Sequence, residues 1–585
     1  MTLRSTCQFV IGAGMMAATA LGATPAPAQG LAGPYLAAEH AAKRGDIAEA
    51  SRLFARVLAR DPGNVGLMEQ TMLHQVAAGQ IAQAVAVARK LEETDPGHHL
   101  GVLVLSADGL RKGLYPEARD RLLTGGPDGG PFVGPILQAW AEFGLGNLDG
   151  ARTLLTDLSE KGTGGPVGKI LTAQHLGLIE AANGDDQAAS TALSEAADAS
   201  NRGGSSRLIR QRAGVLSRLG ETTQALDLVE ERLSLTLADR RLEMLAEALR
   251  TGETPGPMIT KAEEGAAEAL FAVSGYVARG NNRLIGLAYA RLATYLDPAH
   301  VEAQLLIADI LSEDSQYGLA IEAYARVPED APEKLDAEIG RAQALEDAGE
   351  LEEGLTVLRE LVARHPGSLE PHTSLGDMLR QAARYGEAAV AYDGAVQLID
   401  TPENRHWVLY YQRGITYERS KQWPKAEADF RKALELEPDQ PLVLNYLGYS
   451  WVEMGAHLDE AREMIEKAVE QRENDGYIVD SLGWVLYRLG QFEEALLHME
   501  RAVELRPVDP VINDHYGDVL WVNGRKTEAE FQWRRALSFE PEEKEIDRIR
   551  RKLDVGLDVV LEEEAAAGDP AIIGTAEPQT DDNGG

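Results

Sequence analysis

Two consecutive stretches, GYIVDSLGWVLYRLGQFEEALLHMERAVELRPVD (residues 476–509) and PVINDHYGDVLWVNGRKTEAEFQWRRALSFEPEE (residues 510–543), place their small and large residues at the same positions. Each match is separated by 34 residues. A fixed repeat of this length is typical of a solenoid, in which each unit packs only on its neighbours. The matching pairs are Leu482 and Tyr516, Gly483 and Gly517, Gly490 and Gly524, Ala495 and Ala529, Ala502 and Ala536, and Pro507 and Pro541.

The repeated residue types predict a pair of antiparallel helices. Glycine or alanine at the eighth position of a unit, and alanine at the twentieth and twenty-seventh, let two helices approach closely while larger residues fill the remaining space. Proline near the end of the unit stops the second helix. The modest content of β-branched and aromatic residues agrees with packed helices rather than sheets. We therefore expect an all-α fold.

This pattern resembles the tetratricopeptide repeat (TPR) family, whose 34-residue unit carries its signature residues at the same places. The resemblance implies an α-solenoid of antiparallel helix pairs, wound as a right-handed superhelix with a concave inner surface that binds partners. In the unit that starts at Gly476, the residues that match the signature are Val479, Leu482, Gly483, Leu486, Ala495, Met499, Ala502 and Pro507.

The repeats predict two arrays in one chain. Units start near Ala267, Val301, Leu335, Leu369, Trp407, Pro441, Gly476 and Pro510, with four extra residues around Glu403 to His406. Glycine and alanine recur at the same spacing nearer the N-terminus, less clearly after residue 125. The expected organisation is an N-terminal array over 29–234, a connector over 235–266, a C-terminal array over 267–543, one capping helix over 544–564 with its charges outward, and a disordered acidic tail over 565–585.

Residues 1–28 have the features of an export signal. Arg4 precedes an apolar run over 9–22, and Ala26-Pro27-Ala28 fits a cleavage site. Cleavage after Ala28 removes Cys7, the only cysteine, which excludes disulfides and Cys-ligated metals in the mature chain. No later apolar run is long enough to span a bilayer. We expect an exported protein, periplasmic in a bacterium or alternatively secreted.

Composition and motifs narrow the function. The formal net charge of −36 gives no basic excess for nucleic acid, so that partner is not expected. No phosphate loop, nucleophile elbow or metal-binding helix is readable, and we expect no cofactor, no metal and no catalytic residue. The carboxylates of Asp480, Asp514 and Asp518 allow an acid–base hypothesis, but no water-excluding pocket accompanies them.

The last repeats hold the candidate binding residues. Six of the seven tryptophans fall between 407 and 533, and two of these, Trp484 and Trp521, occupy places that line the inner surface in the TPR family. Aromatic rings, acids and arginine on one surface suit an extended peptide, while packing against a neighbouring repeat is the alternative. The candidate residues are Tyr411, Asn445, Tyr449, Tyr477, Asp480, Trp484, Tyr487, Arg488, Asp514, Asp518 and Trp521.

The resulting hypothesis is a scaffold or adaptor of the cell envelope that binds a protein or peptide in its groove and catalyses nothing. Exported proteobacterial envelope proteins with these repeats are similar, including the adaptor of a periplasmic carboxyl-terminal processing protease, although this chain lacks the lipid-attachment cysteine of that adaptor. Peripheral association with an envelope complex is then possible. The alternative is a protein that helps to assemble or export an envelope polysaccharide and holds glycan in the groove.

Overall fold

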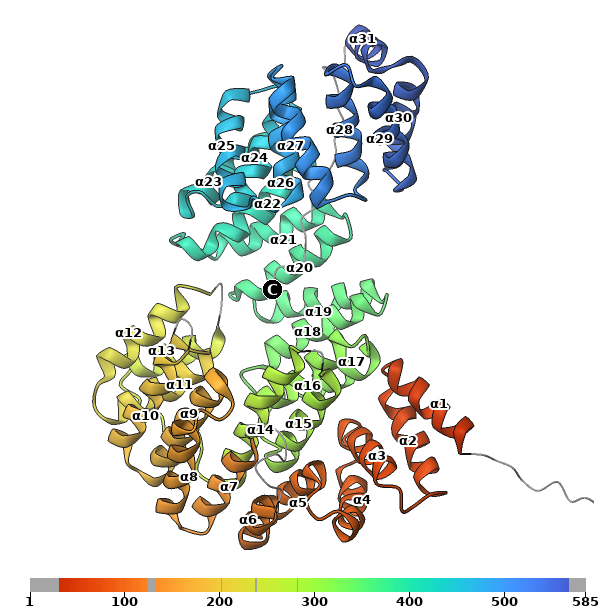
Figure 1. Cartoon of the computed structure of the whole chain (residues 1–585). Helices are drawn as coiled ribbons and strands as arrows, with labels where there is room; N and C mark the ends of the chain where they lie inside the picture. Colours follow the sequence, from red (N-terminus) through yellow and green to blue (C-terminus); the bar gives the residue numbers. More distant parts are fainter. Residues whose placement is uncertain (1–30, 125–132, 201–202, 237–238, 281, 568–585) are drawn as a thin grey trace, which may run out of the picture.

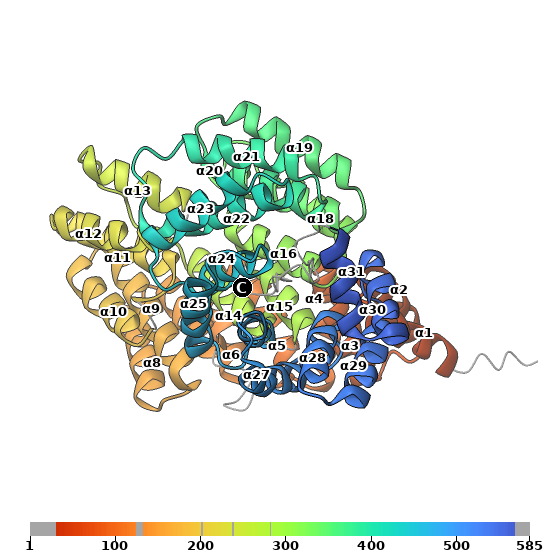
Figure 2. The same cartoon turned by 90° about the horizontal axis from the view of Figure 1, so that it is seen from above.

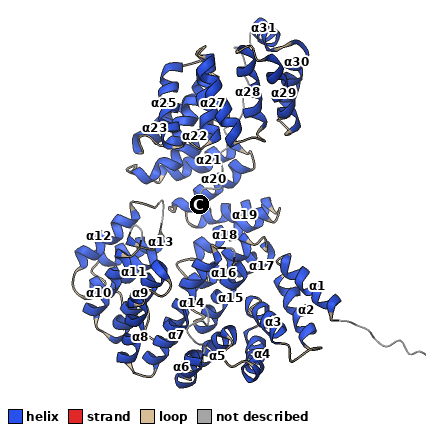
Figure 3. Cartoon of the chain, in the orientation of Figure 1, coloured by secondary structure: helices blue, strands red, loops and turns tan. Residues whose placement is uncertain are grey.

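The computed structural model describes residues 31–124, 133–200, 203–236, 239–280 and 282–567, and every regular element in these ranges is a helix (Figures 1 and 3). The expected all-α class is confirmed. The export signal expected over 1–28 lies outside the described residues, as does most of the expected tail. The helices of the N-terminal array are α1 (Ala32–Lys43), α2 (Ile47–Leu58), α3 (Val65–Ala77), α4 (Ile81–Thr94), α5 (His99–Arg111), α6 (Tyr115–Thr124), α7 (Val133–Gly144), α8 (Leu148–Glu160), α9 (Gly165–Asn183), α10 (Asp186–Asp198), α11 (Ser206–Arg218), α12 (Thr222–Leu233) and α13 (Arg240–Arg250).

The C-terminal array continues the same antiparallel pairing, with the even-numbered helix now first in each pair. A short 3₁₀ turn, η2 (Asn404–His406), interrupts it at the four extra residues. Its helices are α14 (Ala262–Ala278), α15 (Arg283–Leu296), α16 (Val301–Glu313), α17 (Tyr317–Ala325), α18 (Lys334–Asp347), α19 (Leu351–Arg364), α20 (Leu369–Gln381), α21 (Tyr385–Gln397), α22 (Trp407–Arg419), α23 (Trp423–Leu436), α24 (Pro441–Glu453), α25 (Leu458–Gln471), α26 (Gly476–Arg488), α27 (Phe492–Leu505), α28 (Pro510–Val522), α29 (Lys526–Ser538), α30 (Glu543–Val555) and α31 (Leu557–Ala567).

The recurring glycine near the middle of each unit forms the turn between its two helices. Gly490 and Gly524 have φ of 76° and 79°, a left-handed conformation that glycine adopts without strain. Units without this glycine keep the conformation, since Ser315, Ala383 and Lys421 have φ of 57°, 55° and 60° at the same place. The same turn therefore recurs even where the sequence signal fades.

The glycine at the eighth position makes room for a large side chain of the second helix. A β-carbon placed on Gly414 would lie 2.7 Å from the Phe430 ring, and one on Gly517 would lie 2.4 Å from the indole of Trp533. Both rings are fully buried. Close approach of the two helices thus depends on the missing side chain, as the repeat pattern predicts.

The two arrays share one hydrophobic core. Helices α14 and α15, the first pair of the C-terminal array, lie against α3, α5, α7 and α9, which line the inner face of the N-terminal array (Figures 1 and 2). A single cluster of buried residues runs from Met68 through Trp140 to Leu270 and Leu292. The concave face of the N-terminal array is therefore occupied by the chain itself.

The region expected as a connector is narrower than its predicted range of 235–266. Helix α13 and the start of α14 both fall inside that range, and only 251–261 links them without a helix. The extra residues at η2 also join the arrays, because Arg405 Nη1 donates to the carbonyl oxygens of Leu233, at 3.0 Å, and Thr236, at 3.3 Å.

The C-terminal end differs from the single capping helix predicted over 544–564. The structure has two helices, α30 and α31, separated at Gly556, whose φ of 87° no continuing helix accepts. Helix α31 extends to Ala567, into the range expected to be disordered. Its charges also differ from expectation, because Arg548 and Lys552 of α30 point inward, as described below.

The packing of the C-terminal array on the N-terminal array can be tested at Gly265. A β-carbon there would lie 2.2 Å from the Trp140 ring, so Gly265→Ala should cost about 1–3 kcal/mol of unfolding free energy through overpacking. On the same helix, a β-carbon on Gly275 would meet only Leu306, at 3.8 Å. Gly275→Ala should therefore be neutral or stabilising by up to about 1 kcal/mol. Denaturant unfolding measures both, and equal stabilisation by the two substitutions would contradict the insertion of α14.

Candidate functional site

The predicted residues of the last repeats gather on one concave surface, here called the C-terminal groove. It is formed by the inner faces of α24, α26 and α28 and is covered by α30. Its central side chains are buried rather than open to solvent. The residues that define the groove are Glu453, Asp480, Trp484, Asp514, His515 and Asp518, with Arg548 and Lys552 contributed by the cover.

The first three candidate residues belong to the packed core of the repeats. Tyr411 is 4% exposed, and its ring lies 6.2 Å from Phe430 and 5.9 Å from Tyr446. Asn445 and Tyr449 are each 6% exposed on α24. These side chains therefore present no open surface to a partner.

Trp484 sits at the centre of the groove with both faces of its indole covered. Its ring stacks on Tyr487, with centroids 4.8 Å apart, and on His515, with centroids 4.0 Å apart. Its Nε1 donates to Glu453 Oε1 at 2.8 Å. The side chain is fully buried, so it holds α24, α26 and α28 together.

Asp480 and His515 form a buried pair across neighbouring repeats. His515 Nδ1 lies 3.0 Å from Asp480 Oδ2, and both residues are less than a tenth exposed. Burial raises the pKa of Asp480, and His515 only partly offsets this. Burial alone would lower the pKa of His515, but the neighbouring Asp480 carboxylate raises it. The pair thus shares one proton inside the groove.

Asp514 and Asp518 hold the cationic side of α30. Lys552 Nζ lies 2.8 Å from Asp514 Oδ2 and 2.7 Å from Asp518 Oδ1, with the lysine side chain fully buried. Arg548 Nη1 lies 3.8 Å and 3.6 Å from the same two carboxylates. Burial raises the pKa of Asp518, while Lys552 acts against that rise. Two acids and two cations therefore close the groove from opposite helices.

The remaining candidates lie around this centre. Tyr477 is half-buried under Arg506, whose guanidinium carbon lies 4.6 Å from the ring centroid. Trp521 Nε1 donates to Asp558 of α31 at 3.0 Å. Tyr487 is 7% exposed, and Arg488 is half-buried beside it.

Sequence reasoning missed the two cations of α30. Arg548 and Lys552 are four residues apart, which places them on one face of a helix, and Asp514 and Asp518 have the same spacing on α28. This matched spacing was the available signal. A capping helix was expected to turn its charges to solvent, but two buried carboxylates are stable only with cations beside them.

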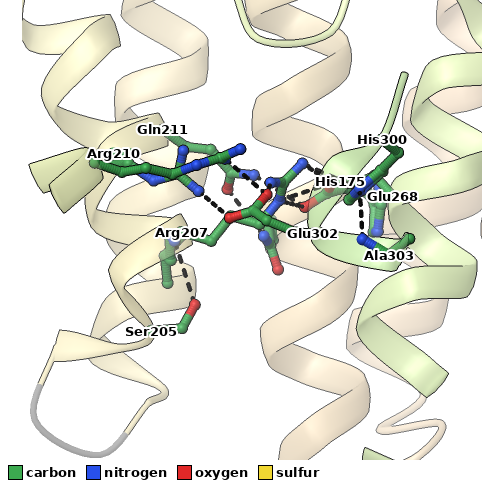
Figure 4. Close-up of polar contacts among 12 residues, drawn as sticks. His175, Ser205, Arg207, Arg210, Gln211, Glu268, His300, Glu302 and Ala303 are labelled. Atoms are coloured by element: carbon green, nitrogen blue, oxygen red, sulfur yellow. Dashed lines mark hydrogen bonds and ion pairs between the residues drawn. The ribbon is translucent and has the colours of Figure 1, made fainter. Parts of the chain in front are cut away.

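A second polar cluster lies between the two arrays and was not predicted (Figure 4). We call it the junction cluster: Arg207, Arg210 and Gln211 of α11, Glu268 of α14, and His300 and Glu302 at the start of α16. Glu268 is 1% exposed and accepts from Arg207 Nε at 2.6 Å and Gln211 Nε2 at 3.2 Å. Arg210 pairs with Glu302.

The junction cluster joins the two arrays. Burial would raise the pKa of Glu268, but Arg207 and the hydrogen bond with His300 hold it well below its usual value. Nearby, burial lowers the pKa of His175 to about 4, so the imidazole is neutral and its Nδ1 accepts from Trp140 Nε1 at 3.1 Å. The contacts of Glu268 and Glu302 with Arg207 and Arg210 therefore join α11, α14 and α16.

The two clusters can be compared with the requirements of a metal site. The described residues contain no group of three or more His, Cys, Asp or Glu side chains placed to hold a metal ion. Within the same residues, no helix combines the length and the apolar composition that crossing a bilayer requires. What both clusters offer is a set of paired charges between packed helices.

Comparison with known proteins places these repeats in a family. Two family models described as tetratricopeptide repeat match residues 376–541 and 339–402. A TPR repeat-containing protein of Pseudomonas aeruginosa is 26% identical over 201 residues, covering 34% of this chain and 32% of that protein. Human tetratricopeptide repeat protein 13 is 29% identical over 174 residues, which cover 29% of this chain and 20% of the human protein. The chain thus spans about a third and a fifth of the length of these relatives.

Two solved structures are similar to this chain at low sequence identity. The Cut9–Hcn1 hetero-tetramer of the APC/C covers 91% of this chain and 97% of its own, with 14% identity and a TM-score of 0.37. YrrB, described as a TPR protein with an unusual peptide-binding site, covers 32% of this chain and 94% of its own, with 20% identity and a TM-score of 0.26.

The groove predicts a pH dependence centred on Glu453. Burial raises the pKa of this carboxyl to about 7, although Trp484 and the nearby cations oppose the rise. Because the folded pKa exceeds the unfolded value, the folded state binds the extra proton between about pH 4.5 and 7, and stability falls as the pH rises through this window. The loss is at most about 3 kcal/mol. Glu453→Gln keeps an acceptor for Trp484 and should remove this part of the slope.

Denaturant unfolding from pH 5 to pH 8 measures the effect, with Glu460→Gln, an exposed glutamate of α25, as the control. The expected result is a Glu453→Gln protein that is more stable than wild type at pH 8 and similar to it at pH 5. Parallel pH profiles for the two proteins would contradict a raised pKa for the half-buried Glu453.

Proposed function

We propose that this chain, which belongs to the tetratricopeptide repeat family, is a scaffold whose C-terminal groove binds a partner segment with paired basic side chains. Repeats of this family mediate protein–protein interaction and are generally not catalytic. The observation that carries the proposal is the seating of Arg548 and Lys552 against Asp514 and Asp518. The partner segment would take the place of α30.

The charged contacts between α28 and α30 favour exchange of α30 for such a segment. Lys552 and Arg548 are held by the carboxylates of α28, and a helix with two cations four residues apart can present the same charges. Removing the cation of a buried pair costs about 3–5 kcal/mol, so the acids discriminate strongly against a segment that lacks basic residues.

The alternative of a groove that holds envelope polysaccharide has less support. Sugar recognition uses an open aromatic face, but Tyr487 and His515 cover the two faces of Trp484. The ring of Trp521 lies 5.3 Å from that of Trp533 and 4.2 Å from Lys526 Nζ. A peptide that binds through its charged side chains does not require the indole of Trp484 or of Trp521 to be exposed.

The proposal is tested with a labelled peptide of residues 543–556 and the full-length protein. Wild type should bind the peptide weakly, because its own α30 competes at high effective concentration. The Arg548→Ala, Lys552→Ala protein should bind at least about tenfold more tightly, since its cover no longer satisfies the acids. Adding Asp514→Asn and Asp518→Asn to that protein should abolish the gain. Fluorescence anisotropy gives the three affinities.

The matched control removes two cations from the solvent side of the same helix. The side chains of Arg550 and Arg551 are 65% and 46% exposed, so their replacement by alanine should leave peptide binding at the wild-type level. If the inner and outer pairs had the same effect, net charge rather than the groove would explain binding. Capture of partners from the native source with the same variants, followed by mass spectrometry, then identifies the natural ligand.

We also propose that the protein is exported and works in the bacterial envelope. This rests on the features of residues 1–28, which lie outside the described part of the chain. N-terminal sequencing of the protein from its native source should find a mature chain that starts near Gln29, in the periplasmic fraction. A chain recovered from the cytoplasm with Arg4 still present would refute export.

A further inference from the structure

A cavity of about 240 Å³ lies where the end of the N-terminal array meets the link over 251–261. Helices α9, α10, α11 and α13 form its walls, and Pro332 of the C-terminal array closes one side. This volume exceeds the roughly 150 Å³ of an engineered apolar cavity that binds benzene. At roughly 30 Å³ for each atom-sized group, it has room for about eight carbons.

The wall of the cavity is held in place by specific contacts. Arg218 is fixed by Asp186, with its Nη2 at 2.7 Å from Oδ1, and its Nη1 donates to the carbonyl oxygen of Pro255 at 3.2 Å. Gly214 leaves the space between α11 and this link open, because a β-carbon there would lie 3.9 Å from the Pro255 ring. The cavity is therefore bounded by an ordered wall.

The lining combines an apolar interior with cations. Leu178, Leu193 and Val215 form the buried part, each at most 3% exposed. Met244 and Met258 are 50% and 40% exposed at the boundary with solvent. Methionine adapts its shape to an apolar ligand, and such exposed residues are frequent at binding surfaces.

The charged residues that line the cavity are all arginines, namely Arg210, Arg218 and Arg241, although the whole chain has a net charge of −36. The Nη atoms of Arg241 pair with Glu302 and Glu333, but its Nε is buried with no hydrogen-bond partner among the described residues. Burial, together with the neighbouring arginines, lowers the pKa of Arg210 to about 10 and that of Arg241 to about 9. Since all three arginines also pair with acidic side chains, the unpaired Nε of Arg241 is the donor that remains for an anionic group.

We propose that this cavity binds a small amphiphilic carboxylate, with an apolar chain of about eight carbons among Leu178, Leu193 and Val215 and its carboxylate at Arg210 and Arg241. The charge complementarity selects an acid over a neutral or cationic amphiphile. Because the cavity contacts both arrays, the ligand would also stabilise their relative position. The site is separate from the C-terminal groove and does not depend on the function proposed for it.

Octanoate is the probe, measured by isothermal titration calorimetry on the full-length protein, with 1-octanol as its neutral analogue. Wild type should bind octanoate at least about tenfold more tightly than 1-octanol. Gly214→Leu places a side chain in the cavity and should weaken octanoate binding at least about tenfold. The matched control is Gly386→Leu, at an exposed helical glycine with no atom within 4 Å of a β-carbon, and it should leave binding unchanged.

A second pair of variants tests the charge without filling the cavity. Met258→Glu adds an anion at the exposed edge and should weaken octanoate binding about fivefold or more, while changing 1-octanol binding less than about twofold. Met258→Gln has the same size without the charge and should behave like wild type. This pair carries the test if circular dichroism shows that Gly214→Leu does not fold.

Each contrary result overturns the proposal. No measurable heat with wild type up to millimolar octanoate would show that the cavity is not a ligand site. Equal affinity for octanoate in wild type and a folded Gly214→Leu protein would place binding elsewhere. Equal affinity for octanoate and 1-octanol, or equal loss in Met258→Glu and Met258→Gln, would remove the role of the arginines.

Discussion

The contact between Trp140 and the bare backbone of Gly265 sets the architecture of the whole chain. It lets α14 lie against α7 and joins the cores of the two arrays into one. Because α14 is seated there, Glu268 falls within reach of Arg207, and α16 brings His300 and Glu302 to the same place. The junction cluster, the filled N-terminal concave face and the cavity beside α11 all follow from this seating.

Buried charges determine the relative position of helices that apolar packing alone would leave variable. Helices that meet through alanine and leucine alone can slide by a fraction of a turn, whereas a buried carboxylate with named donors has one position. Glu268 fulfils this role between the arrays, and Asp514 and Asp518 fulfil it at the C-terminal end. The Arg207–Glu268 contact spans 61 residues, and the contacts of Lys552 with Asp514 and Asp518 span 38 and 34.

The helix pairs could be predicted from the sequence because their determinants are local. The spacing of Gly483 and Gly517, and of Gly490 and Gly524, reports close approach and a left-handed turn within a single unit. The seating of α14 could not be predicted in this way, since the repeat pattern specifies how a unit packs on its neighbours and not which distant helix covers an inner face. The aromatic and acidic strip at Trp484 and Asp514 was recognisable, whereas its cover by α30 was missed because the charges of that helix were expected to face solvent.

The two concave faces are both filled by the chain, but they differ in how easily a partner can replace the cover. The N-terminal face is closed by apolar side chains such as Leu270 and Val273, and exposing each one costs about 1.5–3 kcal/mol. The C-terminal groove is closed by the charges of Arg548 and Lys552, which a basic segment of a partner can supply in equal number, together with the buried side chain of Ile549 on the same helix. Exchange of one ion pair for another leaves little net cost, whereas opening the apolar face leaves a large one. Of the two faces, the C-terminal groove is therefore the one that we propose for partner binding.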